Sequence, residues 1–248
     1  MIVLIGLTTV LAWYLLKWLG RHLAIAAMAV SRLTPWTRGV HAWVLSAPAT
    51  FCYVAVFTCF TLVQTTAPPR LIDVMTAIDS TNLHHLRKNA VQVLATSSFW
   101  VADHGSGLSL YIVGFAAAVA YAERRWGTPR LLLIALAGHV LGSLLTEGLL
   151  RRAINAGRLP AKLATTTDVG VSYMLVAGLV AAVTALSGRV RAAAAAVLLV
   201  FLVTPVLTSR TIWDLGHVLA ACCGLAVCLL VRLAGPLRSP GPFRQRGD

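Results

Sequence analysis

Two short stretches of the sequence place a carboxylate beside a group capable of nucleophilic or acid–base chemistry. Asp168 precedes Ser172 by four residues, and Asp214 precedes His217 by three. In a helix each pair lies about one turn apart, on the same face. Both stretches open long apolar runs, where a charged or imidazole side chain is costly and by default marks a functional site. A serine activated by a histidine base is the simplest chemistry that these residue types allow.

The composition of the chain indicates a membrane protein. Of its 248 residues, 58 % are hydrophobic and 12 % are charged, whereas ordinary soluble domains carry roughly 25 % charged residues. Several apolar runs reach about 20 residues, the length that an α-helix needs to cross a bilayer. We therefore expect an all-α, multi-pass protein of a cell membrane, with the lipid bilayer as its first partner.

Neither the positive charge nor the cysteines indicate a partner other than the membrane. The net charge is +13, but the Lys and Arg residues lie between apolar runs rather than along one face, so we expect no nucleic-acid partner. The five cysteines all lie inside apolar segments and lack the paired spacing of disulfide or zinc motifs. We expect no metal and no cofactor.

The apolar runs divide the chain into three predicted parts. Residues 1–40 are expected to hold an N-terminal hydrophobic helix and a basic juxtamembrane segment, with a break at Pro35-Trp36. Residues 41–233 form the predicted transmembrane domain, and residues 234–248 a disordered basic tail. The segment 65–106 is too polar to span and too long for a turn, so we expect it to be partly folded. Six spans are predicted, at 42–62, 108–122, 131–150, 169–186, 192–208 and 213–233.

The basic residues also predict an orientation. Thirteen Lys and Arg residues lie on the side that holds the C-terminus, against eight on the side of the segment 65–106. Because cytoplasmic loops are enriched in Lys and Arg, the C-terminus is predicted to be cytoplasmic and the segment 65–106 to lie outside. The fourth and sixth spans then both run inward from the outer face. Ser172 and His217 are therefore predicted at similar depth on parallel helices.

The third predicted span carries a polar stripe. His139, Ser143 and Glu147 recur every four residues and so share one helix face. The stripe either supports the site near Ser172 or, as a remote alternative, relays protons in a proton- or metal-coupled transporter. Six short spans without an inverted repeat are unlike a secondary carrier. Small residues predict close helix packing at Gly138 and Gly142 in this span, and at Gly216, Ala220 and Gly224 in the sixth.

Each carboxylate beside the two candidate groups has a structural interpretation as well. A carboxylate is favoured at a helix N-terminus by capping and by the helix dipole. We expect Asp168 to be a solvated residue of this kind. For Asp214 two interpretations stay open, a helix cap or a group that orients His217.

The order of the motifs resembles the rhomboid superfamily over roughly residues 41–233. Six spans with a long loop after the first are accompanied by a Leu-Thr-Ser-x-Phe-like segment at 94–99 and a Glu-x-x-x-Gly turn at 123–127. A Gly-x-Ser motif follows on the fourth span, and a His-x-x-Ala-x-x-x-Gly motif on the sixth. The resemblance implies a rhomboid-like six-helix bundle, here with an additional N-terminal helix. In the active proteases of this superfamily the serine and histidine form a catalytic dyad, which corresponds here to Ser172, after Gly170, and to His217.

Two positions depart from the protease pattern. The proteases carry His-x-x-x-Asn on the second span, which supplies hydrogen bonds to the oxyanion. Counted back from Glu123, these positions fall on Gly107 and Tyr111. The literal match, His85 with Asn89, precedes the Leu-Thr-Ser-like segment, and we interpret it as a coincidence. The glycine expected after the serine is Tyr173, a bulky residue at a point of close helix approach.

Two functions from different classes therefore remain open. The retained Ser172 and His217 favour a rhomboid-type serine endopeptidase that cleaves transmembrane substrates. The missing His/Asn pair favours a catalytically inactive rhomboid-like protein, a pseudoprotease that binds transmembrane segments of client proteins. In both cases Gly170, Asp168, Asp214, His139 and Glu147 are the expected supporting residues.

Overall fold

A computed structural model describes residues 2–101, 107–209 and 211–238 of the chain, and all regular structure in these ranges is helical. The chain divides into two compact units, one within residues 1–46 and one within residues 47–240. The predicted disordered tail lies mostly outside the described residues. The helices of the first unit are α1 (Ile2–Leu19) and α2 (Ala24–Ser46). Those of the second are α3 (Pro48–Thr66), α4 (Pro69–Ile78), α5 (Leu83–Ser97), α6 (Leu108–Gly114), the π-helical η1 (Phe115–Val119), α7 (Ala120–Trp126), α8 (Thr128–Asn155), the 3₁₀ turn η2 (Ala161–Thr165), α9 (Val171–Ala185), α10 (Gly188–Thr208) and α11 (Ile212–Leu233).

Two boundaries predicted in the first 50 residues differ from the structure. The break expected at Pro35-Trp36 is wrong, because α2 continues through Pro35 to Ser46. A proline costs such a helix one backbone hydrogen bond, here the one that the Ser31 carbonyl would accept, and α2 tolerates this loss. The first predicted span starts six residues late in the structure, at Pro48, which occupies a favourable first position of a helix.

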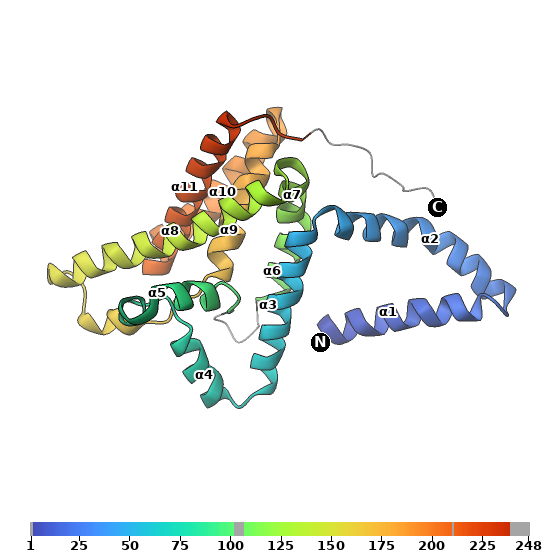
Figure 1. Cartoon of the computed structure of the whole chain (residues 1–248), viewed down its shortest axis with the longest axis horizontal. Helices are drawn as coiled ribbons and strands as arrows, with labels where there is room; N and C mark the ends of the chain where they lie inside the picture. Colours follow the sequence, from blue (N-terminus) through green and yellow to red (C-terminus); the bar gives the residue numbers. More distant parts are fainter. Residues whose placement is uncertain (1, 102–106, 210, 239–248) are drawn as a thin grey trace. The chain divides into compact units, whose positions relative to one another are not determined.

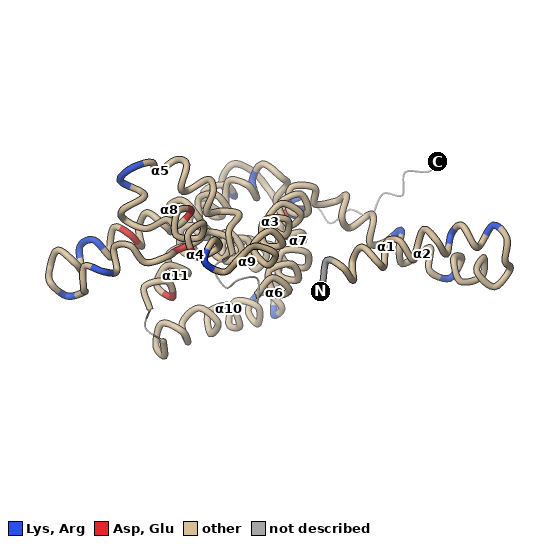
Figure 2. The backbone as a smooth tube through the Cα atoms, turned by 90° about the horizontal axis from the view of Figure 1, so that it is seen from below, with Lys and Arg blue, Asp and Glu red and all other residues tan. Residues whose placement is uncertain are grey.

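The second unit contains the helices that carry the candidate residues. Four of the described helices, α3, α8, α10 and α11, are long and apolar enough to cross a membrane. The predicted span at 108–122 is divided among α6, η1 and α7, and the span at 169–186 corresponds to the 15-residue α9. Apart from Arg87 and Lys88 of α5, the described Lys and Arg residues of this unit lie at helix ends and connections, and the middle of α8 to α11 is free of them (Figure 2). These features are those of a multi-pass membrane protein.

Helix α9 is the centre of this unit (Figure 1). It packs against α6, η1, α7, α8, α10 and α11, and ten of its fifteen residues are buried. The predicted small-residue faces are confirmed as the places where helices approach most closely. Gly138 and Gly224 both lie against Ala177 of α9, and Gly142 lies against Ala220. The position of Ser172 is therefore set by tight packing on several sides.

The turn that contains the Glu-x-x-x-Gly motif lies near the C-terminal end of α9, away from Ser172, where the Trp126 indole N–H donates to the Ala181 carbonyl. Glu123 is buried, and its carboxylate accepts hydrogen bonds from the backbone N–H groups of Ala49 and Thr50 at 3.1 and 2.8 Å. It also accepts from the hydroxyls of Thr50 and Thr128, both at 2.7 Å. Gly127 has a φ of 83°, a conformation that favours glycine. The motif thus joins the start of α3 to the turn between α7 and α8.

Candidate active site

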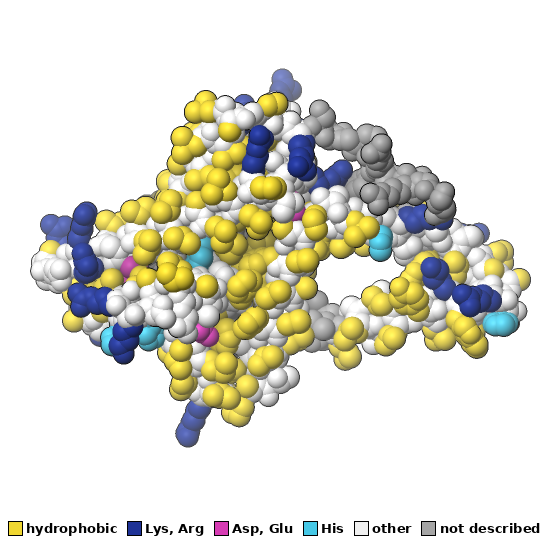
Figure 3. All heavy atoms as spheres, in the orientation of Figure 1, with side chains coloured by type: hydrophobic (Ala, Val, Ile, Leu, Met, Phe, Trp, Pro, Cys, Tyr) yellow, Lys and Arg dark blue, Asp and Glu magenta, His cyan; other side chains and the backbone are white. Residues whose placement is uncertain are grey.

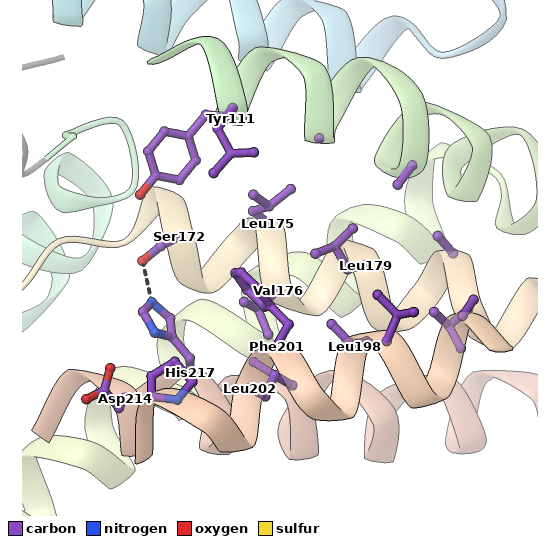
Figure 4. Close-up of a pocket in the computed structure, with 18 of the residues that line it drawn as sticks. Tyr111, Ser172, Leu175, Val176, Leu179, Leu198, Phe201, Leu202, Asp214 and His217 are labelled. Atoms are coloured by element: carbon purple, nitrogen blue, oxygen red, sulfur yellow. Dashed lines mark hydrogen bonds between the residues drawn. The ribbon is translucent and has the colours of Figure 1, made fainter. Parts of the chain in front are cut away.

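Ser172 and His217 meet at the N-terminal ends of two packed helices. Ser172 is the second residue of α9, and His217 lies in the second turn of α11. The Ser172 Oγ atom is 2.9 Å from the His217 Nε2 atom, a hydrogen bond between two half-buried side chains (Figure 4). The predicted contact between the two residues is present. It is the arrangement in which a histidine can take the proton of a serine hydroxyl.

The pair lies at one end of an elongated cavity of about 670 Å³ between α6–η1, α9 and α10. Its walls are almost wholly apolar, and the labelled leucines and Phe201 extend away from the pair along its length (Figure 4). Tyr111 of α6 stands on the wall opposite Ser172, with its hydroxyl directed toward the serine. The cavity therefore joins a reactive polar end to a long apolar channel.

Tyr173 supports His217 from the side. Its ring lies 5.3 Å from the His217 ring, centroid to centroid, and its hydroxyl donates to Asp168 Oδ2 at 3.1 Å. A Cβ atom on Gly216 would come within 2.0 Å of the Tyr173 hydroxyl. The bulky residue that departs from the protease pattern thus fits because Gly216 leaves room for it. The pairing of a large residue with a glycine on another helix was the available signal, and sequence reasoning missed it.

The expectation that Asp168 is solvated is wrong. Only 4 % of its surface is exposed, and Gly170, not Asp168, is the N-cap of α9. Besides Tyr173, the Thr81 hydroxyl donates to Oδ2 at 3.3 Å, while the Ser80 hydroxyl accepts from the Asp168 N–H at 2.8 Å. The connection between α4 and α5 covers the carboxyl group and removes it from water. Burial, acting against these hydrogen bonds, raises the pKa of Asp168 from 3.8 to about 7.

This shift predicts that folding stability falls as the pH rises. Because the folded state holds the Asp168 proton more tightly than the unfolded state, the protonated group stabilises the fold below the folded pKa. That contribution is lost between about pH 4 and pH 7. We expect Asp168→Asn, which stays neutral, to flatten the decline in unfolding temperature of detergent-purified protein across this range. An unchanged pH profile in the variant would show that Asp168 does not cause it; Glu147, which interacts with Asp168, is the next carboxyl group to test.

Asp214 takes part in the N-terminal cap of α11, in which Thr211 is the N-cap residue and Asp214 the third residue of the helix. Its Oδ2 atom accepts from the backbone N–H and the hydroxyl of Thr211, at 2.9 and 2.6 Å, and the Thr211 hydroxyl accepts from the Asp214 N–H in return. These reciprocal bonds form a capping box at the start of α11. Of the two interpretations left open, the structure therefore supports the cap. Trp213 joins this end of α11 to the chain before α9 through a 2.9 Å bond from its indole N–H to the Thr167 carbonyl.

The polar stripe of α8 lies behind the pair. His139, Ser143 and Glu147 are all buried on one face, as predicted. The His139 Nε2–H donates to the Leu94 carbonyl of α5 at 2.8 Å. A Cβ atom on Gly170 would come within 2.1 Å of the His139 ring, so the glycine before the serine allows this close contact. His139 therefore links α5 to the start of α9. Within the described ranges, no group of three or more His, Cys, Asp or Glu side chains is placed to hold a metal.

The literal His-x-x-x-Asn match lies away from the cavity lining. The His85 Nδ1–H donates to the Ser80 carbonyl at 3.2 Å, and the Asn89 amide donates to Gln92 at 2.8 Å. Neither His85 nor Asn89 lines the cavity that holds Ser172. Of the two positions counted back from Glu123, Gly107 has no side chain to offer, whereas Tyr111 reaches the cavity.

Comparison with known protein families identifies the fold. Residues 42–236 match the family described as rhomboid-like protein, which covers the whole membrane domain. No curated protein and no solved structure matches the chain. The match includes every helix that shapes the cavity, together with Ser172 and His217, so the chain belongs to the rhomboid-like protein family.

Proposed function

We propose that this protein is an intramembrane serine protease that cleaves transmembrane segments of other proteins. The observation that carries the proposal is the 2.9 Å hydrogen bond between Ser172 Oγ and His217 Nε2 at the end of an apolar cavity. This arrangement suits an apolar polypeptide segment that lies in the cavity and brings one of its peptide bonds to the Ser172–His217 pair. Burial of both groups away from bulk water strengthens their interaction.

In the proposed reaction Ser172 attacks the carbonyl carbon of the scissile bond while His217 Nε2 takes the serine proton. His217 then gives this proton to the leaving amine, and water hydrolyses the acyl-enzyme with His217 again as the base. Ser172 lies in the first turn of α9, where backbone N–H groups have no intrahelical partner and the helix dipole is positive. This end of α9 therefore favours the negative charge of the tetrahedral intermediate.

Tyr111 is the side chain best placed to add a second oxyanion donor. Its hydroxyl points toward Ser172 from the opposite wall, at a position where the proteases of the superfamily carry Asn (Figure 4). Because one oxyanion donor contributes roughly 10²–10³ in rate, we expect Tyr111→Phe to slow acylation of Ser172 by about 10²-fold. The measurement is the second-order rate constant for labelling by a fluorophosphonate probe.

Tyr121→Phe is the matched control for this prediction. Tyr121 lies on α7 and its hydroxyl donates to the Ala185 carbonyl at 3.4 Å, outside the cavity lining. The control loses the same hydroxyl group and is expected to label within a few-fold of the native rate. Equal labelling rates for the two variants would remove Tyr111 from the mechanism.

The cavity also suggests the class of substrate. Its length is bordered by α10, on which Leu202 is the single buried residue among the described positions, so this helix has few contacts with the rest of the unit. An apolar channel beside a loosely packed helix suits a transmembrane segment entering from the bilayer. With the C-terminus in the cytoplasm, as the distribution of Lys and Arg suggests, cleavage takes place toward the outer side of the cell membrane.

The test of the proposed function is covalent labelling of detergent-purified protein by a fluorophosphonate probe. We expect the native protein to be labelled and Ser172→Ala to remain unlabelled, because the probe needs an activated serine. A second candidate, a catalytically inactive protein that binds client transmembrane segments, is favoured by Gly107 and Tyr111 in place of the His/Asn pair. Absence of labelling in native protein, beside an active rhomboid protease that is labelled, would leave this second function.

A further inference from the structure

A second, smaller cavity lies where α8 ends, beside the start of α5 and the turn η2. Its volume is about 230 Å³, compared with about 30 Å³ for one water molecule in the liquid. Its basic residues come from two helices: His84 and Arg87 from α5, and Arg151 from α8. Leu83, Ile154 and Ala164 provide apolar surface beside them. The cavity is therefore large enough for an anionic group with an attached apolar portion.

The charged side chains that line this cavity are of one sign, and the nearest carboxylate, Glu147, interacts with the Leu83 backbone N–H behind the lining. None of the described residues that line it is acidic, and the side chains of His84, Arg87 and Arg151 are exposed at its mouth. Basic and histidine side chains gather at this end of the unit, as the blue and cyan spheres beside α5 and the end of α8 show (Figure 3). Such a cavity attracts an anion.

The depth of the cavity suggests where that anion comes from. Helix α8 is one of the candidate membrane spans; Leu150 is still buried, and Arg151 follows it in the last turns. A cationic side chain at the end of a membrane helix lies at the level of the lipid headgroups. The apolar residues of the cavity lie beside the charged ones, as the glycerol and acyl region of a lipid lies beside its phosphate.

We propose that this basic cavity binds the phosphate of an anionic phospholipid from the leaflet nearest to Ser172 and His217. The bound headgroup bridges α5 to α8. This matters for the candidate active site because the part of α5 after its kink at Asn89 contacts the start of α9 directly. The Ser97 carbonyl accepts from the Gly170 N–H at 2.8 Å, and the Leu94 carbonyl accepts from His139. Bound lipid is therefore expected to stabilise the packing of α5 and α8 beside the start of α9, whether or not the protein is a protease.

The test measures lipid binding to the full-length protein in a neutral detergent. Phosphatidylglycerol, phosphatidylcholine and inorganic phosphate are titrated separately, with unfolding temperature and native mass spectrometry as readouts. We expect saturable stabilisation and one retained lipid with phosphatidylglycerol. In the double variant Arg87→Gln/Arg151→Gln the apparent affinity should fall by about 30-fold, as expected from the loss of two interfacial cations.

The matched control is Arg158→Gln/Lys162→Gln. It removes the same charge from the connection between α8 and α9, at residues that do not line the cavity, and is expected to keep native affinity. Equal weakening in both double variants would overturn the proposal in favour of a general surface charge effect. Equal stabilisation by phosphatidylcholine would overturn the requirement for an anionic headgroup. Equal stabilisation by inorganic phosphate, with displacement of the lipid, would identify a free anion as the ligand. If the two double variants differ in unfolding temperature without lipid, the fraction of protein that retains lipid in native mass spectrometry gives a comparison that does not depend on stability.

Discussion

Replacement of His217 by alanine is expected to lower the rate at which Ser172 reacts with a fluorophosphonate by about 10⁴-fold or more, as for removal of the base from other serine hydrolases. The reason lies in the 2.9 Å contact between Nε2 and the Ser172 Oγ atom. Without the imidazole the serine loses its base: of the other polar side chains in the described wall, Tyr111 is a weakly basic hydroxyl and the Asp214 carboxylate is bonded to Thr211. The second-order rate constant of labelling measures this effect directly.

Asp214→Asn is the variant that separates a dyad from a triad. The Asp214 carboxylate is committed to Thr211 at the start of α11, at 2.6 and 2.9 Å. We expect the variant to label within a few-fold of the native rate and to lose about 0.3–1 kcal/mol of stability, the usual contribution of a carboxylate in the first turn of a helix. A loss of labelling as large as that of His217→Ala, in protein that still unfolds cooperatively, would contradict this assignment and give Asp214 a catalytic role.

The helices that carry the site could be predicted from the sequence because membrane helices have a strong local signal. Long apolar runs, basic connections and small-residue spacing each depend on neighbouring positions alone. The contact between Ser172 and His217 also follows if the two spans are parallel. Its prediction needed the resemblance to a family as well, because no local rule brings residues 45 positions apart together.

The polar shell around the pair could not be predicted in the same way. Asp168 is buried because the connection between α4 and α5 folds over it and supplies the hydroxyls of Ser80 and Thr81. Tyr173 fits because Gly216 lies opposite its hydroxyl. Both facts depend on contacts between segments distant in sequence, whereas capping rules use only local spacing. The same limit leaves Asp214 between two interpretations from sequence and makes the sequence-based expectation for Asp168 wrong.

Gly138→Ala is expected to destabilise the membrane domain by about 1–3 kcal/mol, the usual cost of overpacking a well-packed interface. A Cβ atom at this position would come within 2.3 Å of the Ala177 Cβ of α9 and 3.3 Å of the Ala220 carbonyl oxygen of α11. Neither neighbour is the flexible end of a long side chain, so α8 must move away from both helices. Because α9 and α11 carry Ser172 and His217, labelling should fall together with the unfolding temperature.

Gly148→Ala on the same helix provides the comparison. A Cβ atom there would have no neighbour within 4 Å, and alanine is favoured over glycine in a helix by about 1 kcal/mol. We therefore expect this variant to unfold at the native temperature or above and to keep its labelling rate. If Gly138→Ala and Gly148→Ala unfolded at the same temperature, the close approach of α8 to α9 would not be a source of stability. The position of Ser172 beside His217 would then have to be set by the polar contacts of Asp168 and Tyr173 rather than by the glycine face.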